Sequence, residues 1–72
     1  MKLYRVEIIN GQPLETFIAN IATEKEGIAK LQELKEHMVN TGYNVKSSDI
    51  DHLIVEKTIS NGTTVYKRFE LE

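Results

Sequence analysis

The dipeptide Asn61-Gly62 lies between two runs of alternating apolar residues and decides how those runs can pair. An Asn-Gly pair in this setting is typical of a tight β-hairpin, and the length of its loop sets the register of both strands. With a two-residue loop, Leu53 would oppose Glu70, and both sides of the hairpin would mix apolar and charged residues. We therefore predict a three-residue loop over residues 60–62, a type I turn with Gly62 in the left-handed bulge position.

This register gives the hairpin one apolar face and one polar face. Leu53 opposes Phe69, and the same face carries two lysines whose stems can reach water at the end of the sheet. The opposite face pairs His52 with Glu70, a combination suited to an exposed cross-strand pair. The apolar face is predicted to contain Leu53, Val55, Ile59, Val65, Phe69 and Leu71, together with Lys57 and Lys67.

Two more strands are predicted before residue 22. In residues 2–9 an apolar series alternates with Arg5 and Glu7, so we expect the apolar series, Tyr4, Val6 and Ile8, to face the core. Residues 10–13 contain Asn, Gly and Pro and are predicted to turn the chain into a second strand over residues 14–21. That strand has two nearly equal apolar faces, and the choice between them stays open: Phe17, Ala19 and Ile21, or Leu14, Thr16 and Ile18.

A helix is predicted from Thr23 to about residue 41. Thr23 and Glu26 have the spacing of a capping box, in which each side chain binds the backbone amide of the other residue. Gly42 follows the last turn and suits the left-handed position after a helix, with Tyr43 as the apolar contact of a Schellman motif. The apolar stripe that packs on the sheet is predicted to consist of Ile28, Leu31, Leu34 and Met38.

These elements predict an α+β fold, a two-layer β-β-α-β-β sandwich in which one helix covers one face of a four-stranded antiparallel sheet. We expect the sheet order 2-1-3-4, with the most apolar strands, residues 2–9 and 52–59, in the centre. The fourth strand carries Lys67-Arg68, which suits an edge, and residues 47–51 are predicted to be loop. Residues 1–72 are expected to form a single domain. Leu71-Glu72 also matches a cloning scar, the dipeptide that vectors place before a polyhistidine tag, so we assign it no function.

Composition excludes several classes of protein. Cysteine is absent, which removes disulfides and thiolate metal sites and fits a reducing compartment, so we expect the cytoplasm. The formal net charge of −2 gives no overall attraction to nucleic acid. No apolar run reaches the roughly 20 residues of a membrane span, and the N-terminal segment lacks the apolar stretch of a signal peptide. We therefore expect no membrane insertion and no export by that route.

Few side chains are arranged for catalysis or for holding a cofactor. Asp49, Asp51 and His52 are the only close group of oxygen and nitrogen ligands, but an Asp after Ser commonly makes a turn to the backbone. His37 suits the C-terminal end of the helix by charge. The isolated glycines form no phosphate loop, and Gly27 is explained by close packing of the helix on the sheet. A small sheet with one helix offers little concavity, so we expect no enzyme, no metal and no cofactor.

The remaining surface suggests two functions. One helix cannot cover both faces of the sheet, so apolar residues on the far face predict contact with a protein partner, or with a second copy in a homodimer. The alternative, weaker because acidic residues intervene, is an accessory nucleic-acid-binding role based on stacking and charge around Tyr66. The candidate interface consists of Leu3, Ile9, Ile54 and Tyr66, with Leu14 and Ile18 or Phe17 and Ile21 from the second strand. The candidate nucleic-acid contact consists of Arg5, Lys57, Tyr66, Lys67 and Arg68.

Overall fold

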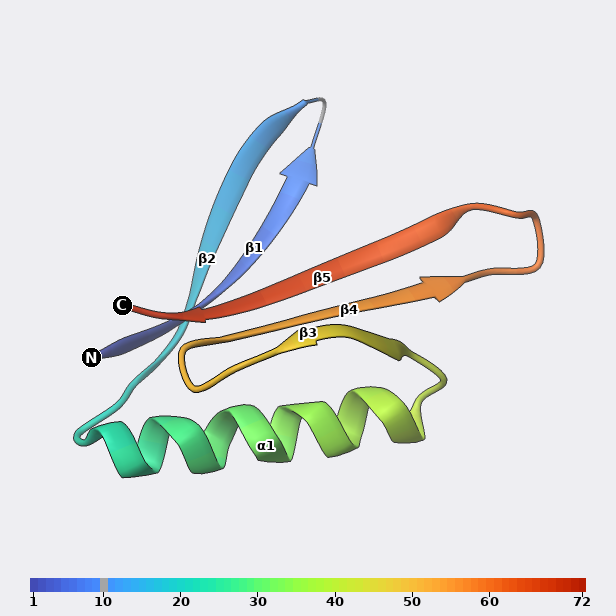
Figure 1. Ribbon diagram of the computed structural model, residues 1–72. Coiled ribbons are helices and arrows are strands. Elements are labelled where there is room, and N and C mark those ends of the chain that lie inside the picture. The colour runs from blue at the N-terminus through green and yellow to red at the C-terminus, as the bar shows by residue number, and fades with distance from the viewer. Residues whose placement is uncertain (10) are drawn as a thin grey trace.

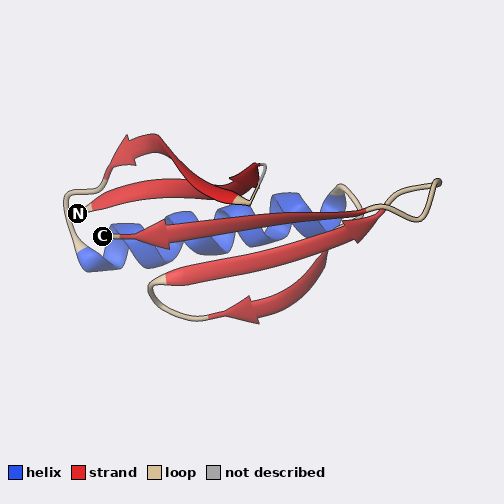
Figure 2. Ribbon diagram, turned by 90° about the horizontal axis from the view of Figure 1, so that it is seen from above, coloured by secondary structure: helices blue, strands red, loops and turns tan. Residues whose placement is uncertain are grey.

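The computed structural model describes residues 1–9 and 11–72, with the backbone alone at Ile9. Asn10, part of the predicted turn, lies outside the described residues. The strands of the sheet are β1 (Lys2–Ile9), β2 (Gln12–Asn20), β3 (Asn44–Ser48), β4 (His52–Thr58) and β5 (Thr64–Leu71), and the helix is α1 (Glu24–Asn40). All neighbouring strands are antiparallel, and α1 lies along one face of the sheet (Figure 1, Figure 2). The predicted α+β class, with one helix and an antiparallel sheet, is confirmed.

The number of strands differs from the prediction. The described residues form a sheet of five strands in the order β2-β1-β5-β4-β3, not of four in the order 2-1-3-4. The additional strand, β3, includes Ser47 and Ser48, which the sequence predicts to be loop. This polar segment is extended because its backbone amides and carbonyls bond to the free edge of β4. The predicted loop is therefore limited to residues 49–51.

The predicted edge strand, β5, is the central strand of the sheet. It pairs with β1 on one side and with β4 on the other, so that Phe69 lies between Arg5 and Leu53. Phe69 is therefore almost completely buried. Its basic residues are tolerated in the centre. The Lys67 amine reaches outward to lie 5.3 Å from the centre of an aromatic ring, and Arg68 pairs with a glutamate on the face away from α1.

The β4–β5 hairpin has the predicted register. Leu53 pairs with Phe69, and both are buried together with Val55. Gly62 has a φ of 86° and donates its N–H to the carbonyl of Ile59 at 2.9 Å, which closes the loop. The three-residue loop and its left-handed glycine are confirmed. The hairpin also reaches past the C-terminal end of α1 (Figure 2), so its tip is not covered by the helix.

Strand β1 turns the opposite face to the core from the one predicted. Leu3 is completely buried and pairs with Leu71 of β5, and Arg5 and Glu7 follow it on the same face. The β1–β2 hairpin rises away from α1 after its first residues (Figure 1), so its further residues do not reach the helix. The apolar series predicted for the core therefore lies on the face that α1 leaves uncovered: Tyr4, Val6 and Ile8.

Strand β2, whose register the sequence leaves open, contains a β-bulge. Leu3 pairs with Ala19 but Tyr4 pairs with Phe17, so Ile18 is the extra residue. Ala19 packs against the core, whereas Phe17 turns to the uncovered face. Neither of the two predicted apolar faces extends along the whole strand. Residues before the bulge point to the opposite face from the one that a regular strand would give them.

Helix α1 begins after Thr23 and ends before Gly42, as predicted, but of the two bonds of the predicted capping box the described residues show only the one that Thr23 accepts. The Thr23 hydroxyl accepts a hydrogen bond from the amide of Glu26 at 3.1 Å. At the other end, Gly42 has a φ of 94°, and Tyr43 donates its N–H to the carbonyl of Met38 at 2.9 Å. Together with the hydrogen bond from the Gly42 amide to the Val39 carbonyl, this is the Schellman pattern.

The core lies between α1 and the sheet. Because Gly27 has no side chain, the first turn of the helix packs closely on the sheet, as expected. Its nearest neighbour is Leu71 of β5. Among the described residues there is no helix of the length and apolarity needed to cross a membrane. The buried apolar residues are Leu3, Ile21, Leu31, Met38, Leu53, Val55 and Phe69, with Ala19, Leu34, Tyr43, Val45 and Leu71 packed around them.

Removal of the helix cap should have a measurable cost. We expect Thr23→Ala to lower the free energy of unfolding by about 1 kcal/mol, because the amide of Glu26 loses its side-chain acceptor. Urea denaturation monitored by circular dichroism measures this change. Thr63→Ala is the control, since Thr63 is also exposed but lies in the β4–β5 loop. An unchanged midpoint for Thr23→Ala would contradict the cap.

Candidate functional site

The face of the sheet opposite α1 carries exposed apolar side chains, which we call the apolar patch. Three of them are strongly exposed: Ile8 at 70%, Tyr66 at 60% and Phe17 at 51%. The Phe17 ring packs edge-on against Tyr4, with ring centres 6.1 Å apart. Clustered exposed apolar side chains generally mark a contact surface. The patch consists of Tyr4, Val6 and Ile8 from β1, Phe17 from β2, Ile54 from β4 and Tyr66 from β5.

An open groove runs through the patch where β1 and β5 separate. Pairing between these strands ends at Val6 and Arg68, although both strands continue beyond that point. The groove has a volume of about 730 Å³. The groove lies between the two separated strands, so patch residues from three strands line it together with Glu7, Val65 and Lys67 from the face on which α1 lies. Its lining consists of Val6, Glu7, Ile8, Ile54 and residues 64–68.

Tyr66, beside the groove, has polar neighbours that affect its pKa. Tyr66 lies opposite Glu56 on β4, and the hydrogen bond that its hydroxyl donates, followed by that from Lys46, lowers the pKa of the Glu56 carboxyl. The same hydrogen bond raises the pKa of the Tyr66 phenol. Lys46 Nζ lies 3.2 Å from Glu56 Oε1. At neutral pH the phenol is therefore uncharged, and its ring remains exposed.

Of the predicted interface residues, Ile54 and Tyr66 belong to the apolar patch. Leu3 does not: it is completely buried under α1, a correction that follows from the reversed face of β1. The side chain of Ile9 lies outside the described part of the chain. Strand β2 contributes a mixture of the two predicted alternatives. Phe17 joins the patch, Ile21 is buried, and Leu14 and Ile18 are exposed elsewhere on the strand.

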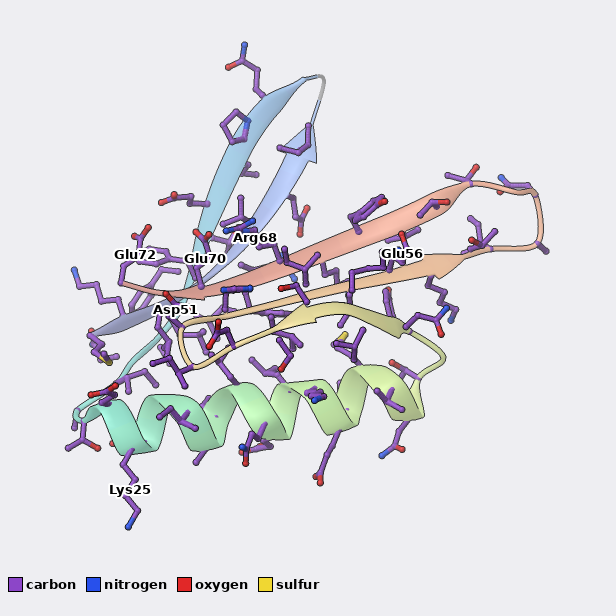
Figure 3. All side chains as sticks on the ribbon, viewed as in Figure 1. Lys25, Asp51, Glu56, Arg68, Glu70 and Glu72 are labelled. Atoms are coloured by element: carbon purple, nitrogen blue, oxygen red, sulfur yellow. The ribbon has the colours of Figure 1, made fainter. Side chains whose placement is uncertain are left out.

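The predicted nucleic-acid contact is not assembled on one face. Arg5, Lys57 and Lys67 belong to the face on which α1 lies. Tyr66 and Arg68 lie on the opposite face, where Figure 3 shows Arg68 pointing away from the helix. Both arginines are also paired with a glutamate two residues further along their own strand. The basic and aromatic side chains therefore do not form one continuous surface.

The close group of oxygen and nitrogen ligands in the sequence, Asp49, Asp51 and His52, is divided in the structure, and His52 takes part in a different arrangement. Asp49 accepts a hydrogen bond from the amide of the next residue, Ile50, and takes no part in a ligand group. Asp51 Oδ1 lies 3.0 Å from His52 Nδ1, and Ser47 Oγ lies 2.7 Å from His52 Nε2. The imidazole thus connects a carboxylate on one side with a hydroxyl on the other.

A second group of carboxylates lies at the end of the sheet. Oxygen atoms of Glu15, Glu70 and Glu72 lie within 4.8 Å of one another. Figure 3 shows Glu70 and Glu72 near the C-terminus. Glu70 already accepts a hydrogen bond from Arg68, and the other two are exposed, so we assign no metal to this group.

Comparison with known proteins finds no protein family, no characterised protein and no solved structure that matches this chain. Function must therefore be inferred from the geometry of the molecule itself.

Proposed function

We propose that this protein is a protein-interaction module that associates with a second copy of itself through the apolar patch. The orientation of β1 carries the proposal. The apolar side chains of this strand face away from α1, while Arg5 and Glu7 occupy the side on which the helix lies. Arg5 Nε and Glu7 Oε1 are 2.6 Å apart there, as an ion pair whose N–H is not aligned for a hydrogen bond. Apolar side chains are stabilised when they leave water. This orientation therefore favours a state in which another surface covers the patch.

A symmetric dimer also suits the small core of this protein. A chain of about this length buries only about 60% of the surface that its unfolded form exposes, and partner subunits commonly supply the missing burial. In a two-fold dimer the same patch is used by both copies, so Ile8, Phe17 and Tyr66 of each copy lie against apolar side chains of the other. Aromatic residues are enriched in such interfaces, and the patch contains three.

The other parts of the proposal come from the sequence. We propose that the contact between the two copies needs no cofactor, and that the protein works in the cytoplasm, as its cysteine-free composition suggests. A different protein is the rival occupant of the patch. Nucleic acid is the other rival, and salt distinguishes it: rising salt weakens binding to phosphates steeply but leaves an apolar contact unchanged or tighter.

Analytical ultracentrifugation over a concentration series tests self-association. We expect the wild-type mass to rise from that of the monomer to that of the dimer, with stability rising in parallel. Ile8→Lys should keep the protein monomeric, because it places a charge beside the groove. Ile8 is preferred to Ile54 because Ile54 is half-buried, and a charge there would also disturb the fold.

The matched control is Ile50→Lys, the same substitution at an isoleucine that is 56% exposed in the turn between β3 and β4. Ile50 lies beside residues of α1, outside the patch, so this variant should associate like the wild type. A wild-type protein that stays monomeric at high concentration would refute self-association, and equal loss of association in the two variants would refute the apolar patch as the interface.

A further inference from the structure

Ser47, His52 and Asp51 form a hydrogen-bonded series that the proposed function does not use. The Asp51 carboxylate can only accept a hydrogen bond, so the Nδ1 of a neutral His52 must carry the proton. His52 Nε2 is then left with its lone pair and accepts the hydroxyl proton of Ser47 over 2.7 Å. A nucleophile, a base and a group that orients the base are therefore connected in the order that nucleophilic catalysis requires.

A β-bulge places Ser47 in this position. Val45 pairs with Val55, but Ser47 pairs with Ile54, so Lys46 is the extra residue in β3. Without this bulge Ser47 would lie opposite Leu53 and face the core. The bulge turns the hydroxyl instead to the uncovered face, on the same side as His52. Bulges occur frequently beside active sites, where they redirect a side chain in this way.

The groove of the uncovered face comes close to Ser47 through one shared neighbour, Ile54. The Ser47 and His52 side chains are half-buried, and Asp51 is exposed at the turn between β3 and β4 (Figure 3). Ile54, which lies opposite Ser47, also lines the groove and offers an apolar surface beside the hydroxyl.

We propose that Ser47 is a nucleophile, activated by His52 and oriented through Asp51, that reacts with small activated esters. Ser47 Oγ attacks the carbonyl carbon and transfers its proton to His52 Nε2. The bond from the carbonyl carbon to the leaving oxygen breaks, and the alcohol or phenol departs with that proton. Water then attacks the acyl-serine through the same base, which releases the carboxylic acid and restores Ser47. This reactivity departs from the sequence-based expectation of a chain without catalytic chemistry.

A fluorophosphonate probe tests the nucleophile directly, because it forms a phosphorus–oxygen bond to an activated serine and releases fluoride. After trypsin digestion, mass spectrometry is expected to find the adduct on Ser47, within the peptide of residues 47–57 that follows Lys46. Hydrolysis of p-nitrophenyl acetate should show an initial burst of p-nitrophenol as the acyl-serine accumulates. His52→Gln should slow both reactions roughly 100-fold, the contribution of a general base.

Neighbouring residues of the same types provide the controls. Ser48→Ala and His37→Gln remove a serine and a histidine outside the hydrogen-bonded series and should leave labelling unchanged, whereas Ser47→Ala should abolish it. Asp51→Asn, at an exposed turn residue, should fold and react more slowly than the wild type. Circular dichroism of each variant identifies any that does not fold.

The reactivity of Ser47 does not depend on self-association of the protein. Labelling is therefore measured on Ile8→Lys as well as on the wild type, so that a dimer contact cannot shield Ser47. No adduct on Ser47 in either protein would overturn the proposal. Labelling that stays at the wild-type rate in folded His52→Gln and Asp51→Asn would overturn it equally, and would leave the three side chains as a structural link between β3 and the turn.

Discussion

Leu3→Ala is expected to lower the free energy of unfolding by about 3 kcal/mol, within the range of roughly 2–5 kcal/mol for such changes in protein cores. Leu3 is completely buried and attaches β1 to the core under α1. The substitution removes its apolar contacts and leaves a cavity that the surrounding side chains fill only in part. A domain of this size has a stability of about 4–11 kcal/mol, so the loss is a large part of the total. Urea denaturation measures it.

Ile8→Ala is the matched control in the same strand. Ile8 is 70% exposed, so its truncation should change the stability of the monomer by less than about 0.5 kcal/mol. Both variants are measured at low protein concentration, where self-association does not contribute. The comparison tests which face of β1 is buried. If Ile8→Ala lowered the free energy of unfolding more than Leu3→Ala, the buried face of β1 would be the one that the alternation of the sequence predicts.

The features that the sequence predicts correctly are set by local rules. The hairpin loop, the helix cap at Thr23 and the Schellman motif at Gly42 each depend on residues within a few positions of one another. The register of β4 and β5 follows from the same kind of rule, because the loop length fixes which residues face each other. Burial then selects between two registers, and the pairing of Leu53 with Phe69 is the outcome.

The order of the strands is not a local property. Lys67 and Arg68 make β5 resemble an edge strand, but their charged ends leave the sheet on opposite faces and permit a central position. Strand β3 has little apolar content of its own and is extended because the edge of β4 is free. Such choices depend on which backbone edges remain to be paired after the core has formed, and a single sequence does not contain that information directly.

The candidate site shows the same division. Apolar and polar residues alternate in β1 with the predicted period of two. Which of its two faces lies toward the helix depends on how far α1 extends along the sheet. A helix of 17 residues is about 25 Å long and packs along β3 and β4, so it covers only the base of the β1–β2 hairpin, at Leu3, and not the rest (Figure 1). The membership of Ile54 and Tyr66 in the patch follows from the hairpin register and was predictable. Ser47 was not, because its orientation depends on a bulge at Lys46.

Gly27→Val is expected to destabilise the protein by about 2 kcal/mol, through steric conflict between the first turn of α1 and the end of the sheet. A Cβ atom at Gly27 would lie 2.8 Å from Leu71 Cδ1 and 3.3 Å from Ile21 Cγ2. Leu71 is half-buried and can rotate to accept one methyl group. Ile21 is only 4% exposed and β-branched, so the two further methyl groups of valine force the helix away from β5.

Two comparisons separate this conflict from helix propensity. Gly27→Ala gains up to about 1 kcal/mol of propensity, which offsets the smaller displacement of Leu71, so its net effect should lie within about 1 kcal/mol of zero. Ala29→Val introduces valine at an exposed position of the same helix and should cost only about 0.5 kcal/mol. The excess loss in Gly27→Val then measures the contact of α1 with Leu71 and Ile21. Equal losses for Gly27→Val and Ala29→Val would mean that the helix does not approach β5 so closely, and that Leu71 contributes little to the core.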